Sequence, residues 1–144
     1  MNDITSYMLE QTKKILSIDS PTGFTAHAAE YVLGAYKKLG YDAKLTNKGG
    51  IFVCVNDGPD QADDPADAPI LLEAHMDTLG GMVCSINEKG RLMLSALGGM
   101  NPNNAEAENC RVYTRSGKVY SGTFQLKNAS IHVNGSYNLS LIHI

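Results

Sequence analysis

Two uninterrupted apolar runs constrain the fold more than any other feature of the sequence. One is Ile51-Phe52-Val53-Cys54-Val55 and the other is Ile70-Leu71-Leu72. Short runs without polar alternation are typical of strands that are buried on both faces, as in sheets covered by helices on each side. The runs therefore predict strands of a layered α/β sheet, provided that helices lie nearby in the sequence.

The first forty residues contain two candidate helices. Apolar side chains recur near one face of each, at Ile4, Met8, Ile15 and Leu16 in the first and at Ala29, Val32, Leu33 and Tyr36 in the second. Asn2 or Asp3 can cap the first helix, and Gly40 is placed to end the second. Between them, Ser20-Pro21-Thr22-Gly23 has the composition of a turn. The helices and the apolar runs together indicate the α/β class.

A hairpin is expected between the second helix and the first apolar run. Residues 41–46 alternate apolar and polar side chains, which is typical of a strand with one exposed face. Asn47-Lys48-Gly49-Gly50 then forms a turn, so residues 51–55 are expected to return beside this strand.

The pattern of the sequence changes after Asp77. Apolar residues alternate in segments 82–86 and 92–96, which Glu88-Lys89-Gly90 joins, and Ser116-Gly117 joins two further segments. Short alternating segments separated by turns are typical of a small antiparallel barrel or sandwich. We therefore expect a second domain to begin near Thr78.

Charge and hydropathy exclude two classes of partner. The formal net charge is -3, the pI is near 5.7 and there is no stretch rich in Lys or Arg, so we do not expect a nucleic acid partner. No apolar run approaches the ~20 residues that cross a bilayer, and the first residues lack a secretion signal. The sequence predicts a cytoplasmic protein without a membrane partner.

Other residues that could carry chemistry have simpler interpretations. The three cysteines, Cys54, Cys84 and Cys110, are expected to be reduced, buried thiols. The acidic stretch 57–67 lacks the spacing of a calcium loop and is expected to be a surface loop. His27, in the second helix, and His132, in an alternating segment, are expected to be surface or structural residues.

His75-Met76-Asp77 is the main candidate site. His75 follows the run 70–72, so it should emerge at the carboxyl edge of the sheet, where α/β proteins bind ligands. Residues two apart on an extended strand point to one side, so the Asp77 carboxylate can hold one ring nitrogen and leave the other for a metal. Spacing alone leaves a purely structural histidine open, and zinc normally needs at least three protein ligands.

The order of several segments resembles metallopeptidase family forty-two, which includes the glutamyl, deblocking and tetrahedral aminopeptidases. The resembling segments are Ser17-Ile18-Asp19-Ser20-Pro21-Thr22-Gly23, then Leu71-Leu72-Glu73-Ala74-His75-Met76-Asp77-Thr78-Leu79-Gly80, then Gly90-Arg91-Leu92, Leu97-Gly98-Gly99 and residues 122–135. The resemblance spans nearly the whole chain, so it is far more specific than the His-x-Asp motif.

This resemblance implies a metal-dependent aminopeptidase that uses two divalent metal ions, zinc or cobalt, to hydrolyse the first bond of peptide substrates. His75 matches the first metal ligand of the family, and Asp77 matches the acidic catalytic-site residue that orients it. The remaining ligands and the general base lie after an inserted domain in this family. The chain is therefore expected to be an inactive fragment, whose full-length form is a homo-oligomer.

The implied organisation has three parts. Residues 1–77 would be the amino-terminal part of the layered α/β catalytic domain, residues 78–138 the start of the inserted small β-barrel-like domain, and residues 139–144 a non-native tail. Two other interpretations stay open. One is another two-metal exopeptidase or a deacylase, and the other is a non-catalytic assembly or binding module in which His75 is structural.

Overall fold

A computed structural model describes residues 3–55, 70–126 and 132 of the chain. The chain divides into two compact units, Met1–Gly80 and Gly81–Ile144, which we describe separately. The assignment of residues 1–77 and 78–138 to two domains remains a prediction. The acidic stretch 57–67, His143 and the tail 139–144 lie outside the described residues.

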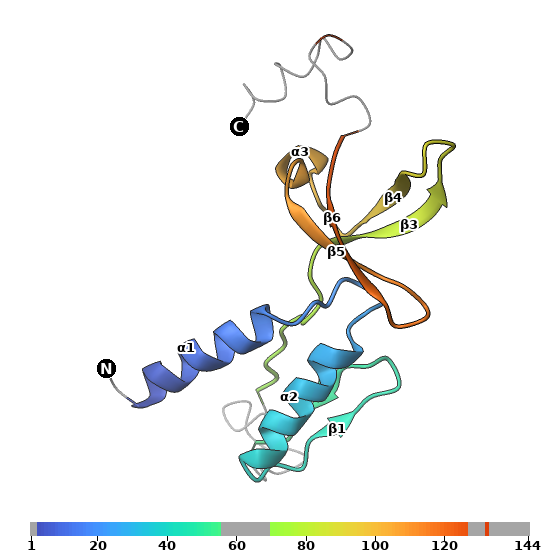
Figure 1. Ribbon diagram of the computed structural model, residues 1–144. Coiled ribbons are helices and arrows are strands. Elements are labelled where there is room, and N and C mark those ends of the chain that lie inside the picture. The colour runs from blue at the N-terminus through green and yellow to red at the C-terminus, as the bar shows by residue number, and fades with distance from the viewer. Residues whose placement is uncertain (1–2, 56–69, 127–131, 133–144) are drawn as a thin grey trace. The chain divides into compact units, whose positions relative to one another are not determined.

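The two predicted helices are present in the first unit. They are α1 (Asp3–Leu16) and α2 (Ala26–Lys38), and the Tyr31 hydroxyl on α2 donates a 2.6 Å hydrogen bond to Gln11 on α1 (Figure 1). Gly40 follows α2 with a φ of 90°, a conformation that favours glycine, so its predicted role in ending the helix is confirmed. No helix in the described ranges is long and apolar enough to span a membrane.

The predicted hairpin is also present, but it is shorter than expected. β1 (Lys44–Leu45) pairs antiparallel with β2 (Ile51–Phe52), and Gly49 adopts a φ of 82° in the turn between them. Helix α2 contacts both strands. The buried apolar side chains of the described residues are small ones, Ala28 and Ala29 on α2 and Ala43 just before β1.

The second apolar run is not a buried strand, so that prediction is wrong. Residues 70–77 belong to no helix or strand, and Ile70, Leu71 and Leu72 are 88%, 70% and 90% exposed. Buried parallel strands need neighbouring strands for their hydrogen bonds and helices for their faces. Within the described ranges no strand pairs with residues 70–77, and Val55 after β2 is exposed for the same reason.

The cysteines also differ from the expectation of buried thiols. Cys54 and Cys84 are exposed, and Cys110 is partly buried. Cys54 follows β2 in an exposed stretch, and Cys84 lies on a strand whose described faces are largely uncovered. The prediction of buried thiols, which was made from their apolar neighbours in the sequence, is therefore wrong for Cys54 and Cys84.

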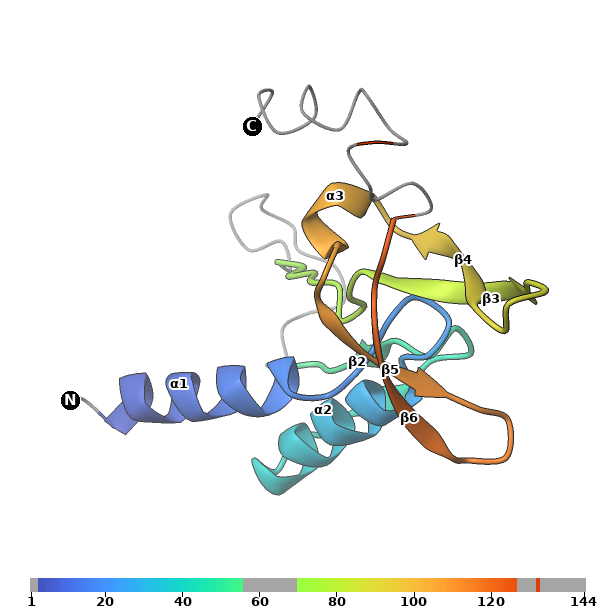
Figure 2. The ribbon, with the colours of Figure 1, turned by 45° about the horizontal axis from the view of Figure 1, so that its top comes forward.

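The second unit contains the expected hairpins. β3 (Gly80–Ile86) pairs with β4 (Leu92–Leu97), and β5 (Asn109–Tyr113) pairs antiparallel with β6 (Val119–Thr123) (Figure 2). Gly90 and Gly117 adopt positive φ values of 74° and 79° in the two turns, as the turn signals predicted. The described strands form two-stranded sheets and no closed barrel. The mixture of helices and strands is compatible with an α/β peptidase domain.

One helical turn in the second unit was not expected. This turn is α3 (Pro102–Ala105). The Asn101 side chain accepts a 3.0 Å hydrogen bond from the backbone N–H of Asn103, and Pro102 occupies the first helical position. Asn followed by Pro is a helix-start signal, but a single turn is too short to show helical periodicity.

Candidate functional site

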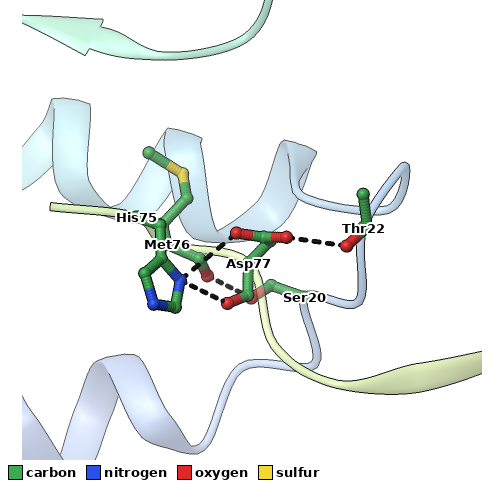
Figure 3. Close-up of polar contacts among 5 residues, drawn as sticks. All are labelled: Ser20, Thr22, His75, Met76 and Asp77. Atoms are coloured by element: carbon green, nitrogen blue, oxygen red, sulfur yellow. Dashed lines mark hydrogen bonds and ion pairs between the residues drawn. The ribbon is translucent and has the colours of Figure 1, made fainter. Parts of the chain in front are cut away.

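The turn formed by residues 20–23, here called the docking turn, lies beside the segment that carries His75 and Asp77. The Ser20 hydroxyl donates a 2.6 Å hydrogen bond to the carbonyl oxygen of Met76 (Figure 3). The backbone N–H of Thr78 donates a 2.8 Å bond to the carbonyl oxygen of Ser20. Pro21 and Thr78 form a parallel bridge. These contacts join parts of the chain that are more than fifty residues apart.

The docking turn is closely packed against this segment. Ser20 is only 2% exposed, so its two hydrogen bonds are shielded from water. At Gly80, a Cβ atom would lie 2.6 Å from the Cβ of Pro21, closer than side chains approach. The absence of a side chain at position 80 therefore allows the chain to pass the proline ring.

His75 is held through one ring nitrogen. Its Nδ1 lies 2.9 Å from the carbonyl oxygen of Asp77 and 3.2 Å from the carboxylate Oδ1 of the same residue (Figure 3). Both partners are oxygens that accept hydrogen bonds, so this geometry favours the tautomer with the proton on Nδ1, and among the described residues no hydrogen bond to Nε2 is formed. The predicted contact between Asp77 and the imidazole is thus present, and the side chain of His75 is 86% exposed.

Asp77 makes a second contact with the docking turn. The Thr22 hydroxyl donates a 2.6 Å hydrogen bond to Oδ2 of Asp77. This bond lowers the pKa of the Asp77 carboxyl below its ordinary value; partial burial acts in the opposite direction, and the nearby imidazole adds a further lowering. Asp77 is therefore an anion at neutral pH, as a carboxylate that orients a ligand histidine must be.

Sequence reasoning identified His75 and Asp77 but gave no role to Ser20 or Thr22. These two residues were interpreted only as parts of a turn and of a resembling segment. Hydroxyl residues in a turn commonly bond to their own backbone, so the local pattern carries no signal for a distant carboxylate. The order of the two resembling segments was the only available indication that they belong together.

The described residues fit one metal-ligand position. An exposed Nε2 lone pair, with Nδ1 held by a carboxylate and a carbonyl, is the usual arrangement of a ligand histidine. However, no group of three or more His, Cys, Asp or Glu side chains among the described residues could hold a metal ion. The assignments of His75 as a ligand and of Asp77 as its orienting residue remain predictions.

The other histidines lie in simple surroundings. His27 is exposed on α2 and makes an edge contact with the ring of Phe24, with ring centres 5.7 Å apart. His132 is exposed in a turn, and its neighbours on both sides lie outside the described residues. Neither residue is part of the arrangement around Asp77.

Two curated proteins are similar to most of this chain. YhfE of Bacillus subtilis, named as a candidate aminopeptidase, is 36% identical over 125 residues, which cover 87% of this chain and 34% of YhfE. The glutamyl aminopeptidase of Lactococcus lactis subsp. cremoris is 32% identical over 112 residues, which cover 77% of this chain and 30% of that protein. The chain thus spans about a third of the length of the curated relatives it matches.

The sequence model of one family matches the part of the chain that contains the site. The family is described as M42 glutamyl aminopeptidase, and the match covers residues 50–138. This range is more than half of the chain and includes both His75 and Asp77. The chain therefore belongs to the M42 family of glutamyl aminopeptidases.

Proposed function

We propose that this chain contributes the first metal ligand of a metal-dependent aminopeptidase, which removes amino-terminal residues from peptides. The observation that carries the proposal is the orientation of His75. Its Nδ1 is held by two oxygens of Asp77, at 2.9 Å and 3.2 Å, and within the described parts of the chain its Nε2 forms no hydrogen bond, in a segment that the family model matches. The names of the two relatives support the activity.

Two divalent ions, zinc or cobalt, are the cofactors of the proposed enzyme, and when bound they would supply an activated water and polarise the peptide carbonyl. His75 would hold one ion through Nε2. Asp77 would keep the imidazole in the tautomer with the proton on Nδ1 and would raise the basicity of Nε2. Asp77 is thus proposed to act on the metal through His75.

The other ligands and the general base are proposed to lie outside the 144 residues. The described residues contain no group of three possible ligands, and the relatives are about three times as long as the matched region. Residues 1–77 would then belong to the catalytic α/β domain and residues 78–138 to an inserted β-domain that contributes subunit contacts. By this proposal the protein is a cytoplasmic homo-oligomer, and the 144-residue chain alone is inactive.

The test is a His75→Ala substitution in the protein extended to the length of its relatives. Release of amino-terminal residues from short peptides should fall by more than about 100-fold, beyond what loss of an orienting residue causes, and the bound metal should decrease by one ion. His27→Ala, at an exposed histidine on α2, is the matched control. Unchanged activity and metal content in His75→Ala would sink the proposal.

A non-catalytic assembly or binding module is the second candidate function. It is favoured by the many large apolar side chains that are exposed, among them Ile70, Leu72 and Phe52. Activity of the extended protein on peptides would exclude it, whereas binding of another protein without any hydrolysis would favour it. Hydrolysis of acylated amino acids instead of peptides would indicate the related deacylase chemistry.

A further inference from the structure

We infer that Thr22 is a positioning residue for the proposed metal site, where its hydroxyl fixes the Asp77 carboxylate in the orientation that holds His75. This inference rests on the proposed function. It assigns a role to a residue of the docking turn, more than fifty positions before the His75-Met76-Asp77 motif.

Each carboxylate oxygen of Asp77 has its own partner. Oδ2 accepts from Thr22 at 2.6 Å, and Oδ1 lies 3.2 Å from Nδ1 of His75 (Figure 3). The terminal torsion of an aspartate is broad, so a carboxylate without a second partner turns readily. A short hydrogen bond on Oδ2 restricts this rotation and keeps Oδ1 directed at the imidazole.

The backbone on both sides of Asp77 is held by the docking turn as well. Ser20 accepts from the N–H of Thr78 at 2.8 Å and donates to the carbonyl of Met76 at 2.6 Å. Ser20 is 2% exposed, so water competes little for these bonds. The main chain of Asp77 is therefore fixed relative to the turn that presents Thr22.

The docking turn is itself closed by a hydrogen bond. The N–H of Phe24 donates a 2.7 Å bond to the carbonyl of Pro21, and Gly23 has a φ of 85°. This closed turn has Thr22 and Gly23 at its centre, and the proline ring restricts the backbone at the position before Thr22. The hydroxyl is consequently presented from a constrained backbone, which reduces the entropy lost in forming the contact.

Thr22 acts through Asp77 and not directly on the imidazole. Without its hydroxyl, Nδ1 of His75 would keep the carbonyl of Asp77 at 2.9 Å, so the tautomer would persist. What would be lost is the fixed direction of the carboxylate, whose side chain is 39% exposed and open to water. The expected result is weaker metal binding rather than loss of the site.

The test is a double-mutant cycle between Thr22→Val and Asp77→Asn, with Zn²⁺ affinity measured by chelator competition in the protein extended to the length of its relatives. Thr22→Val should weaken Zn²⁺ binding about 10-fold, as is typical for groups outside the ligand shell. Thr22→Ser keeps the hydroxyl and should stay within about twofold of the unchanged protein. In the Asp77→Asn background, Thr22→Val should cause no further loss, because its effect passes through the carboxylate.

A second measurement separates positioning from folding. Thr22 is exposed, so Thr22→Val should retain the slow exchange of the Thr78 amide, which is bonded to Ser20. If the Thr78 amide exchanges faster in Thr22→Val because the turn is disrupted, Thr22→Ala removes the same hydroxyl without adding a branched side chain. The Nδ1-protonated tautomer, read from imidazole ¹⁵N shifts, should persist in both variants.

Three results would overturn the inference. They are unchanged Zn²⁺ affinity in Thr22→Val, an equal loss in Thr22→Ser, and additive losses in the double mutant. Failure of the proposed function gives a different pattern, because His75→Ala would then leave Zn²⁺ binding unchanged. If His75→Ala weakens Zn²⁺ binding and Thr22→Val does not, the role of Thr22 is rejected while the proposed function stands.

Discussion

Two neighbouring stretches of the chain, residues 70–72 and residues 76–80, are stabilised in opposite ways. Leu72 is apolar and 90% exposed, whereas the polar Ser20, packed against the second stretch, is 2% exposed. The second stretch is held by hydrogen bonds to the docking turn, whereas the side chains of the first stretch are mostly exposed. The two stretches are only a few residues apart in the sequence, yet only the second is held in place by hydrogen bonds to the docking turn.

This difference teaches that hydrogen bonding and close packing, not apolar burial, hold the candidate site in the described chain. Fully burying a leucine side chain contributes about 1.5 to 3 kcal/mol, and Leu71 and Leu72 realise little of that here. Each hydrogen bond of Ser20 contributes about 1 kcal/mol to the stability of the fold, because water competes little for a buried bond. Substitutions in the two stretches should therefore differ sharply in effect.

The largest effect is expected at Gly80. In Gly80→Ala the new Cβ would lie 2.6 Å from Pro21, and overpacking of this kind costs about 1 to 3 kcal/mol. Exchange of the Thr78 amide, measured by NMR, should become faster accordingly. Gly81→Ala is the matched control, because its nearest atoms lie at an ordinary 3.5 Å. Equal protection of Thr78 in both variants would contradict the packing argument.

A smaller loss of stability is expected from substitution of Ser20. Ser20→Ala removes the donor to the Met76 carbonyl but keeps the backbone bond to Thr78, so it should cost about 1 kcal/mol. Exchange of the Thr78 amide, followed by NMR, measures this loss of stability. Ser17→Ala removes an exposed hydroxyl that bonds locally to the Lys14 carbonyl, and it should leave Thr78 unaffected. If both alanine variants behave alike, burial of Ser20 has no special importance.

A substitution in the exposed stretch should have little effect on stability. Leu72→Ser should change the free energy of unfolding by less than about 0.5 kcal/mol, as surface substitutions generally do. Chemical denaturation of the 144-residue chain checks this value. Ala29→Ser, at a position only 3% exposed on α2, places a hydroxyl in the core and should destabilise more. A reversed order would show that residues 70–72 are packed in solution.

The smallest effect is expected from the ion pair between Glu10 and Lys14 on α1. Each partner shifts the other, so the pKa of Glu10 is lowered and the pKa of Lys14 is raised. The stabilisation should therefore be present between the ordinary values of 4.5 and 10.5, and it should fade as the pH falls through the lowered pKa of Glu10 or rises through the raised pKa of Lys14.

Both groups of this pair are exposed, so water and salt screen it and the change in stability should be barely measurable. Lys14→Gln, compared with Lys13→Gln for the same change in net charge, isolates the contribution of the pair. Thermal unfolding at pH 7 and pH 3 in low salt is the measurement. A clear pH-dependent difference between the two variants would show a stronger pair than its exposure allows.

Local patterns in the sequence predicted the local structure well. Apolar periodicity located α1 and α2, and the glycines at positions 40, 90 and 117 marked the points where helix or strand ends. The contact between His75 and Asp77 could also be predicted, because it joins residues two apart. These features depend on interactions within a few residues, which is the range that periodicity and turn chemistry report.

Features that depend on distant contacts could not be predicted. Burial of residues 70–72 was inferred from composition, but burial requires neighbours that composition does not provide. The hydrogen bond from Thr22 to Asp77 spans 55 positions, and no local pattern distinguishes it from an ordinary turn hydroxyl. α3 was missed for the opposite reason, because a single turn is too short to produce a periodic signal.

The separation between Ser20 and Met76 also affects how the chain is made. Their hydrogen bond closes a loop of 56 positions, at an entropic cost of about 3.6 kcal/mol beyond the constant term. During synthesis at about 5 to 20 residues per second, Ser20 is added to the chain roughly 3 to 11 seconds before Met76. α1, α2 and the first hairpin are therefore synthesised before the segment that carries the histidine.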